Sequence, residues 1–525
     1  MRRISGCRFL PALCFFIGVN AWSAGPLFNV MDYGAHNDGS ASATAAIRSA
    51  IQAAKAAGGG TVYVPAGNYK TGPIELVSNL VFEIEAGAVL HFEASRADLN
   101  FTKGRMEGTE GITPTPLIGG HDLENVTIRG RGTITTDNAQ WLALMRQPDG
   151  VAGRGVWSGI VRTLNLKQPV PPEDFQKAAP GLRPSFIRTM ESKNILIEGI
   201  HIIGSSMWTI HILYSQNVRI RDVTIETFPG ANTDGMDIDS SQDVMISNCF
   251  LDTGDDGICL KSGKDADGLR VNRPTANVTI NNCTVHHAHG AVVLGSETSG
   301  GFHNIVASNI VCQGTQKGVR IKSTRGRGAL IENVRFDHWT MDSVDEAINV
   351  TNYYTRGPEE PVSERTPVFR NIAISNMTIN NSPLMINIEG LPEMPISGLQ
   401  LSNIIATGKV GLRAYNTNAL ELHNVQVNPE VGPAFLVRDS KDLELDQVST
   451  RKPIAGTPVI RLDRCPDAIV RDSRAFAGTG TFLAVGMGEL KSTVLQGNTL
   501  GKAKKATEET AEDFWKLPLP VQTVR

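Results

Sequence analysis

One short pattern recurs along this chain: an Asn or Asp is followed by alternating apolar and polar residues and often by a second Asn. Copies begin at Asn79, Asn125, Asn194, Asn217, Asp243, Asn277, Asn304, Asn333, Asn371, Gly398, Ala419, Asp442 and Asp467. From Asn194 onward the spacings are 23, 26, 34, 27, 29, 38, 27, 21, 23 and 25 residues. A period of roughly 20–50 residues is typical of a solenoid, in which each repeat stacks on the previous one.

Each repeat holds short segments rich in β-branched residues, which alternate at period two and are separated by Asn, Gly and Asp turns. No amphipathic helix is predicted between the repeats, so a doubly wound sheet with crossover helices is excluded. The sequence therefore predicts an all-β fold, a single-stranded right-handed parallel β-helix. The longer intervals are expected to be coils that carry projecting loops.

Two segments depart from the repeat. Residues 44–57 are Ala-rich with apolar residues at helical spacing and end at three glycines, which predicts a short capping helix over the first coil. We assign residues 25–95 to this cap and the first coils. Residues 135–184 do not repeat and are predicted to form a projecting loop insertion over one side or end of the stack. Residues 25–525 are predicted to form one catalytic domain.

The first 24 residues have the features of a secretory signal peptide. Arg2 and Arg3 precede an apolar run from Phe9 to Val19, and Ala21-Trp22-Ser23 fits a small-x-small cleavage pattern. The apolar run is too short to span a bilayer, so we expect no membrane insertion. The sequence predicts an exported protein, either periplasmic or secreted.

The composition limits the partners of the chain. A formal net charge of -3 gives no overall attraction to a polyanion, so nucleic acid is not an expected partner and an acidic ligand needs a local cluster of cations. Without the signal peptide the cysteines are odd in number and form no CxxC pair, so neither a zinc site nor a disulfide framework is predicted. Buried core packing is the expected role for most of them. We expect a monomer without a cofactor or metal.

Four short motifs interrupt the repeats within fewer than a hundred residues. They are Asn232-Thr233-Asp234-Gly235, Gly254-Asp255-Asp256-Gly257, His289-Gly290 and Arg320-Ile321-Lys322. Each lies about one coil from the next, so stacking at ~4.8 Å per coil would bring them into one column. Three carboxylates, an imidazole and two cations would then share a patch.

Crowded carboxylates cannot all ionise freely, so one acquires a raised pKa and acts as an acid while another stays charged as a base. Glycosidic cleavage requires this division of labour. If a water must fit between the base and the sugar, the carboxyl groups stand about 6.5–9.5 Å apart and the anomeric configuration inverts.

In this order, the four motifs resemble the active-site set of the polygalacturonase family, glycoside hydrolase family 28. The similarity includes Arg183-Pro184, Trp208 and His211, and it covers roughly residues 28 to 355. The resemblance implies an inverting hydrolase of the α-1,4-galacturonosyl linkages of pectin, with a pectic polysaccharide or an oligogalacturonide as its substrate.

The resemblance also implies roles for individual residues. Asp255 matches the general acid, Asp234 and Asp256 match the pair that holds and deprotonates the hydrolytic water, and His289 tunes the acid. Substrate-binding roles fall to Asn232, Arg320, Lys322 and either Tyr353 or Tyr354, which would stack on a sugar ring. A guanidinium and an ammonium suit the carboxylate of a uronate.

Two features distinguish this chain within the resemblance. Gly257 and Cys259 stand where many relatives have Cys and Ala, as if a turn residue and a small core residue had changed places. The segment from Gly295 to Gly301 resembles exo-acting bacterial members and predicts attack at a chain end.

Several alternatives remain open at this stage. A pectate lyase would share the fold but would use the three aspartates to hold calcium. A non-catalytic adhesin or carbohydrate-binding β-helix is a second rival, and rhamnogalacturonan and xylogalacturonan are alternative substrates. Asp237 and Asp239 are expected to make structural hydrogen bonds. The basic run from Lys322 to Arg327 is either a solvated loop or an extension of the cationic patch.

Overall fold

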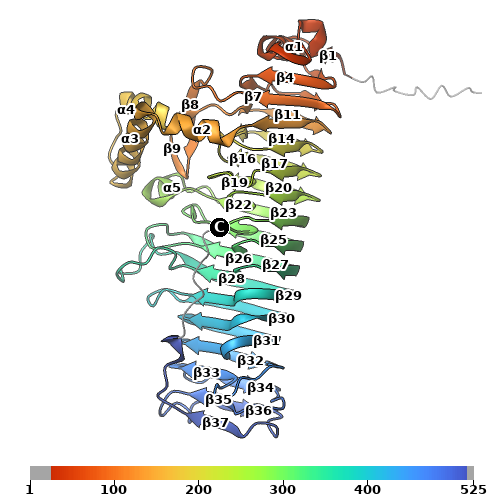
Figure 1. Ribbon diagram of the computed structural model, residues 1–525. Helices are drawn as coiled ribbons and strands as arrows, with labels where there is room; N and C mark the ends of the chain where they lie inside the picture. Colours follow the sequence, from red (N-terminus) through yellow and green to blue (C-terminus); the bar gives the residue numbers. More distant parts are fainter. Residues whose placement is uncertain (1–24, 517–525) are drawn as a thin grey trace, which may run out of the picture.

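The computed structural model describes residues 25–516 and consists of parallel strands wound into one long stack of coils (Figure 1). The predicted signal peptide lies outside the described residues. The right-handed parallel β-helix predicted from the repeats is confirmed. Each coil contributes one strand to each of three faces, and every neighbouring pair in the stack is parallel.

The face that carries the four motifs is termed the site face. Its strands are β5 (Ile74–Glu75), β10 (Ile118–His121), β13 (Ile187–Met190), β16 (Ile210–Leu213), β19 (Met236–Asp239), β22 (Ile258–Lys261), β24 (Val292–Leu294), β26 (Lys317–Lys322), β28 (Glu346–Thr351), the last parts of β29 (Val368–Glu389), β30 (Ile396–Tyr415) and β31 (Thr417–Arg438), β33 (Ile460–Asp463), β35 (Thr481–Val485) and β37 (Lys505–Glu509).

The second face begins with β1 (Leu27–Asn29), β3 (Gly60–Val64), β6 (Leu80–Ile84), β11 (Glu124–Gly130), β14 (Lys193–Glu198), β17 (Gln216–Arg221) and β20 (Gln242–Ser247). It continues through β23 (Thr275–His286), β25 (Phe302–Gln313), β27 (Leu330–Asp342), the first parts of β29 to β31, β32 (Glu444–Asp446), β34 (Ile469–Arg471) and β36 (Val494–Gln496).

The third face holds β2 (Asp38–Ser42), β4 (Gly67–Thr71), β7 (Ala88–Phe92), β12 (Thr133–Thr136), β15 (His201–Ile203), β18 (Thr224–Glu226) and β21 (Phe250–Asp252). From β23 onward, longer strands bend from the second face into the third, since β23 pairs with both β20 and β21.

Alternation of side chains divides each strand between the core and the outside. In the site face the inward column includes Ile187, Ile210, Met236, Ile258 and Val292, all of them fully buried. Such columns of aliphatic side chains fill the interior along the length of the stack. The hydrophobic core thus fixes the register, and the register decides which residues face outward together.

The first residue of every sequence repeat adopts a left-handed backbone, with φ between 48° and 60°. These residues stack above one another at the start of the second face. Amide side chains link neighbouring coils; Asn304 Nδ2, for example, donates to Asn277 Oδ1 at 3.0 Å, and Asn333 Nδ2 donates to Asn304 Oδ1 at 3.1 Å. Asn tolerates this conformation better than most residues, which explains why it marks the repeats.

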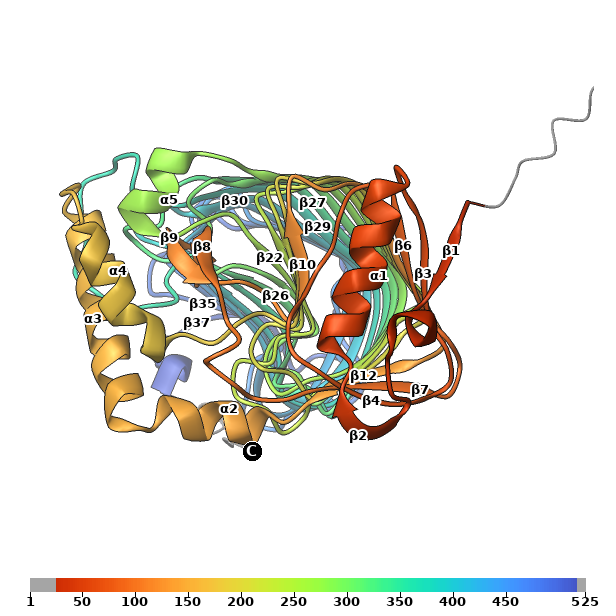
Figure 2. The same cartoon turned by 90° about the horizontal axis from the view of Figure 1, so that it is seen from above.

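The predicted N-terminal cap is present as α1 (Thr44–Ala56). Ile47 and Ile51 on its inner side are fully buried, and the helix contacts β1, β3 and β5. Figure 2 shows α1 lying across the end of the stack. Its apolar side replaces the coil that the first strands lack. The remaining short helical turns are η1 (Val30–Tyr33), η2 (Ala179–Gly181) and η3 (Phe514–Lys516).

The segment predicted as a projecting loop, residues 135–184, is instead largely helical. It contains α2 (Asn138–Met145), α3 (Pro148–Asn165) and α4 (Pro172–Ala178). These helices stand beside the site face, as Figures 1 and 2 show. The prediction missed them because four glycines within α3 and the prolines before α4 weaken the helical pattern in the sequence.

One helix also interrupts the repeats, which the sequence did not predict. α5 (Asp265–Val271) lies in the 34-residue interval between two repeats and is too short to give a clear helical period. An antiparallel hairpin of β8 (Phe101–Met106) and β9 (Thr109–Pro114) projects on the same side as the helices. Among the described residues, no helix is long and apolar enough to cross a membrane.

Candidate active site

Three of the four motifs, those with Asp234, Asp255 and His289, lie in turns that precede neighbouring strands of the site face, and the fourth lies within β26. The backbone N–H of Gly235 donates to the carbonyl oxygen of Asp256 at 2.9 Å, and that of His289 donates to the carbonyl oxygen of Asp255 at 3.0 Å. Consecutive coils therefore stack the turns directly. One carboxylate oxygen from each of Asp234, Asp255 and Asp256 lies within 4.8 Å of the other two. The structure thus brings the three predicted aspartates together.

The two predicted cations lie on β26 and contact one aspartate. Lys322 Nζ is 2.8 Å from Asp256 Oδ2, and Arg320 Nη1 is 3.6 Å from Asp256 Oδ1. Burial opposes ionisation of Asp256, but Lys322, Arg320 and Lys261 outweigh it and lower the pKa of Asp256 to about 2. Asp256 is therefore a fixed carboxylate and a weak proton acceptor.

The pKa of Asp234 is shifted in the opposite direction to that of Asp256. Burial raises its pKa well above the ordinary value, the charges of Asp237 and Asp255 raise it further, and Lys261 opposes them. Neighbouring aspartates on one patch thus have pKa values that are driven apart, as acid and base chemistry requires.

Asp255 is the most accessible of the three. Its side chain is 20% exposed, against 5% for Asp234 and 3% for Asp256. Its Oδ1 lies 3.0 Å from Nδ1 of His289, and this hydrogen bond raises the pKa of His289. A group that protonates a leaving oxygen must reach the substrate, and Asp255 is the carboxyl that is open to do so.

The nearest oxygens of the three carboxyl groups are closer than the about 6.5–9.5 Å that separates the carboxyl groups of most inverting hydrolases. Two oxygens that both hydrogen-bond one water at about 2.8 Å, with a tetrahedral angle between them, lie about 4.6 Å apart. The cluster therefore has the dimensions to hold one water between two carboxylates. Asp256 Oδ1 is buried and makes no hydrogen bond in the described structure, and its nearest cationic neighbour is Arg320 Nη1 at 3.6 Å.

Asn232 begins the first motif and has a left-handed backbone with a φ of 55°. Its Oδ1 accepts a hydrogen bond from Nη2 of the buried Arg183 at 2.9 Å. Arg183 Nη1 also donates to the carbonyl oxygens of Ser206 and Ala231. Asn232 thus links to the scaffold, and Arg183, which the sequence singled out only through its resemblance, fixes the turn that carries Asp234.

The two candidate tyrosines have different surroundings. The ring of Tyr354 is 47% exposed and lies 5.6 Å from the guanidinium of Arg320 and 5.7 Å from Lys322 Nζ. Tyr353 instead lies between Arg325 and Arg356, and its hydroxyl donates to the carbonyl oxygen of Gly357. Tyr354 is therefore the tyrosine that borders the site cations.

The basic run after the RIK motif has a structural role that neither alternative predicted. Arg325 forms a buried bidentate pair with Glu393, and Arg327 pairs with Asp265 and donates to the carbonyl oxygen of Ser296. These arginines tie the loops around the site to one another.

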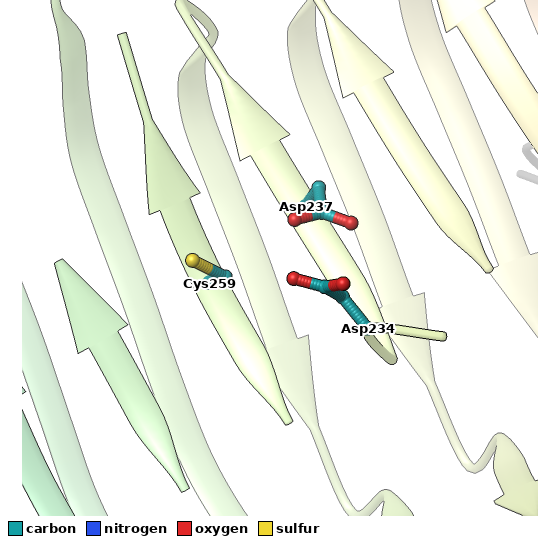
Figure 3. A group of neighbouring side chains, drawn as sticks. All are labelled: Asp234, Asp237 and Cys259. Atoms are coloured by element: carbon teal, nitrogen blue, oxygen red, sulfur yellow. The ribbon is translucent and has the colours of Figure 1, made fainter. Parts of the chain in front are cut away.

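Sequence reasoning missed a second charged cluster beside the three aspartates. Figure 3 shows Asp234 and Asp237 with Cys259 on the neighbouring strand. Cys259 belongs to the outward column of the site face, in register with Asp237 and Val293, so its predicted place in the apolar core is wrong. The four other described cysteines do lie in that core. Lys261, at the end of β22, lies against both aspartates.

Among residues 25–516, three sets of side chains have the composition of a cation site, and two of them lie at the candidate site, namely Asp234 with Asp255 and Asp256, and Asp234 with Asp237 and Cys259. Lys261 and Lys322 already place ammonium groups against these carboxylates. A divalent cation would be repelled by both, so the donor sets favour neutralisation by protein side chains.

The β8–β9 hairpin covers the site face on the N-terminal side of the aspartates. Arg105 of the hairpin forms a fully buried ion pair with Asp239 at 2.6 Å, and the hairpin residues Thr113 and Pro114 accept hydrogen bonds from the buried Arg188. Asp239 thus makes the structural hydrogen bonds predicted for it, whereas the same prediction is wrong for Asp237, whose carboxylate oxygens make none in the described structure. The outward column is closed on this side of the aspartates.

Comparison with known proteins decides the family. Residues 176–449, just over half of the chain, match the model of Glycosyl hydrolases family 28. This chain belongs to glycosyl hydrolase family 28. The family 28 region spans all four motifs, so the chain is a glycoside hydrolase. Residues 27–140 match a second model, described as Rhamnogalacturonase A/epimerase, pectate lyase-like.

Individual relatives of this family 28 hydrolase cover most of the stack. It is 31% identical to an exopolygalacturonase from Thermotoga maritima, with a TM-score of 0.68 over 76% of this chain and 91% of that one. It is 29% identical to a probable polygalacturonase from Vitis vinifera over 72% of this chain and 73% of the relative. For an exo-poly-alpha-D-galacturonosidase from Dickeya chrysanthemi the identity is 28%, over 68% and 62% of the two chains.

Proposed function

We propose that this family 28 hydrolase is an exo-acting polygalacturonase that cleaves the α-1,4-galacturonosyl linkages of pectin with inversion. The observation that carries the proposal is the contact of the aspartate cluster with Arg320 and Lys322. A guanidinium and an ammonium beside an exposed aromatic ring suit a sugar that carries a carboxylate. The named relatives act on the same class of polymer.

The environment of each aspartate supports a division of roles. Asp255 gives its proton to the leaving oxygen as the bond from that oxygen to the anomeric carbon breaks. A water forms the new bond to this carbon and passes its proton to Asp234 in its ionised form, because the lowered pKa of Asp256 makes Asp256 the weaker proton acceptor of the two. Asp256 stays ionised and orients the water. His289 holds Asp255 through its hydrogen bond.

Exo action is supported by the covered side of the site face. On the N-terminal side next to the aspartates, the hairpin covers the outward column, in which Arg188 and His211 are buried, whereas Tyr354 on the C-terminal side is 47% exposed. A polymer can therefore extend from the aspartates in one direction only, which favours cleavage near a chain end. The resemblance of residues 295–301 to exo-acting bacterial members points the same way.

The first test is hydrolysis of polygalacturonate in the presence of EDTA. The proposal expects release of reducing ends without the ultraviolet absorbance of an elimination product, and monomer or dimer as the earliest product. Asp255→Asn should reduce the rate by roughly 10²–10⁴-fold, the usual contribution of a general acid. Loss of activity in EDTA, with an absorbing product in its absence, would identify a lyase.

Three further outcomes separate the rival functions. A ladder of oligomers from the start would keep the hydrolase and overturn exo action. Activity on rhamnogalacturonan or xylogalacturonan, but not on polygalacturonate, would reassign the substrate. Binding of pectin without any cleavage would support a carbohydrate-binding protein. Proton NMR of the first product reports the anomer, and a retained configuration would contradict the single-displacement mechanism.

We further propose that the protein is exported, on the basis of the N-terminal signal sequence. Expression in a Gram-negative host followed by osmotic shock should release the activity with the periplasmic fraction or leave it in the medium. Mass spectrometry of the released protein should find an N-terminus near residue 25. Activity confined to the cytoplasm, with Met1 retained, would contradict export.

A further inference from the structure

Lys261 is the most unusual charged residue around the site, because it is buried among three carboxylates. Only 4% of the residue is exposed. Its Nζ lies 3.4 Å from Asp237 Oδ1, 3.5 Å from Glu297 Oε2 and 3.7 Å from Asp234 Oδ2. The same ammonium lies over the ring of Trp208, 4.5 Å from its centre. Nothing in the proposed reaction so far uses this cation.

Asp237 depends on Lys261 for its counter-charge. The residue is fully buried, and neither of its carboxylate oxygens makes a hydrogen bond in the described structure. Its neighbours in the outward column are His211, whose Nε2 faces Asp239, and Cys259, whose thiol faces Asp256 and the carbonyl oxygen of Gly295. Within residues 25–516, Lys261 is the cation that lies within 4 Å of both Asp237 and Asp234.

Glu297 is held in place by the β8–β9 hairpin. Gly108 at the hairpin tip approaches so closely that a Cβ there would stand 2.7 Å from Glu297 Cγ. The backbone N–H of Lys264 donates to the carbonyl oxygen of Gly108, and that of Ser262 donates to the carbonyl oxygen of Glu297. The element that closes the N-terminal side therefore also fixes one of the three partners of Lys261.

One ammonium among three buried carboxylates leaves excess negative charge, which burial makes costly. A proton retained on one of these carboxyl groups relieves that excess. Opposing charges lower the pKa of Glu297, whereas burial raises the pKa of both Asp237 and Asp234. The retained proton thus belongs to the pair Asp234 and Asp237, and the position of Lys261 decides how it is shared.

We propose that Lys261 and Asp237 are positioning residues that set the pH at which Asp234 ionises to receive the proton of the attacking water: the ammonium of Lys261 favours the ionised form of Asp234, and the carboxylate of Asp237 opposes it. This inference rests on the proposed function. The charged groups that face Asp234 are Lys261, Asp237, Asp255, Asp256 and, at longer range, Arg183 and Glu297. Among them Lys261 is the cation in direct contact, so its removal should change the proton affinity of Asp234 most.

The test is the pH dependence of kcat/KM on polygalacturonate for three variants. Asp234 must be ionised to act, so activity falls as pH drops through its pKa. Lys261→Met removes the stabilising cation and should move this acidic limb to higher pH by about one unit, so that activity below the limb falls about tenfold. Lys261→Arg should restore most of the wild-type profile. Asp237→Asn removes a neighbouring negative charge and should move the limb to lower pH.

The opposite shifts distinguish this role from a purely structural one, which would lower the yield or kcat without moving the limb. If Lys261→Met does not fold, Asp237→Asn decides the question alone, because the substitution is isosteric. An active Asp237→Asn enzyme with an unmoved acidic limb would overturn the inference. Failure of the wild-type enzyme to hydrolyse polygalacturonate would instead count against the proposed function, independently of these variants.

Discussion

Tyr353 and Tyr354 are adjacent in sequence, yet only one of them is placed to meet a substrate. Tyr354 borders Arg320 and Lys322 with an exposed ring, whereas Tyr353 is committed to Arg325, Arg356 and a backbone carbonyl. The sequence left this choice open, because the residues that surround each ring come from other coils.

Tyr354→Ala should weaken binding without slowing the chemistry. Loss of ring stacking at a partly exposed site is worth about 1 kcal/mol, so KM should rise roughly fivefold while kcat changes little. Tyr353→Ala is the matched control and should leave KM within about twofold of the wild type. An equal rise of KM in both variants would indicate that loop order, and not the ring of Tyr354, governs binding.

The aspartates show how far single residues can be assigned from sequence. Their order and spacing predicted that Asp234, Asp255 and Asp256 would meet, because one coil separates each motif from the next. Glu297 could not be found in this way, since it contacts Gly108 of the β8–β9 hairpin, which comes far earlier in the chain. Lys261 lies one coil from Asp237, but it belongs to none of the four motifs. The sequence predicted Cys259 to lie in the core, because a small apolar residue in a strand suggests burial in the core even when its side chain points outward.

At the scale of elements, the hairpin is joined to the stack by charge as well as by apolar contact. Arg105 and Asp239 are both fully buried, and Asp239 also faces His211. Burial opposes the charge of Asp239, but Arg105 and His211 lower its pKa to about 2. The pairing stabilises the folded state above about pH 4, and this stabilisation is lost as pH falls towards 2.

Arg105→Met should destabilise the protein by about 3–5 kcal/mol, because it leaves a buried carboxylate without its partner. Adding Asp239→Asn should recover a large part of this loss, since the uncompensated charge is then gone. Urea unfolding at pH 7 measures both variants. If the double variant were as unstable as the single one, packing of the Arg105 side chain would be the main contribution of this contact.

The insertion at residues 135–184 is an element whose structure the sequence pattern did not predict. The strands could be predicted because the same alternation of apolar residues recurs in coil after coil, and this repetition strengthens the signal. Helices α2 to α4 have no second copy. The apolar residues of α3 and α4 pack on the hairpin and on Trp208 through a separate cluster that includes Trp157 and Met106. A helix held mainly by such distant contacts leaves a weak local signal.

For the molecule as a whole, the stacked left-handed residues set the geometry of the coils. The Asn residues tolerate the left-handed backbone, and their side chains form hydrogen bonds to the coil on each side. Ala419 has the same left-handed backbone, with a φ of 52° but without an amide. The stack therefore tolerates one such position, at a cost of about 1–2 kcal/mol relative to a residue suited to it.

Asn304 allows the two contributions to be separated. Asn304→Gly keeps the left-handed turn and loses the bonds to Asn277 and Asn333, which should cost about 1–2 kcal/mol. Asn304→Ala loses the same bonds and also strains the turn, so it should be less stable than the Gly variant by about 1 kcal/mol. Thermal unfolding of both variants measures the difference. Equal stability would show that the backbone conformation relaxes.

The closed N-terminal side of the site face has a consequence for bulk solutions of the polymer. An enzyme that cuts only near chain ends shortens each molecule by one or two units at a time, so the mean chain length hardly changes at first. A pectate solution should therefore keep most of its viscosity while several per cent of its linkages are already broken. An early collapse of viscosity at the same extent of cleavage would mean that long chains pass the hairpin and are cut internally.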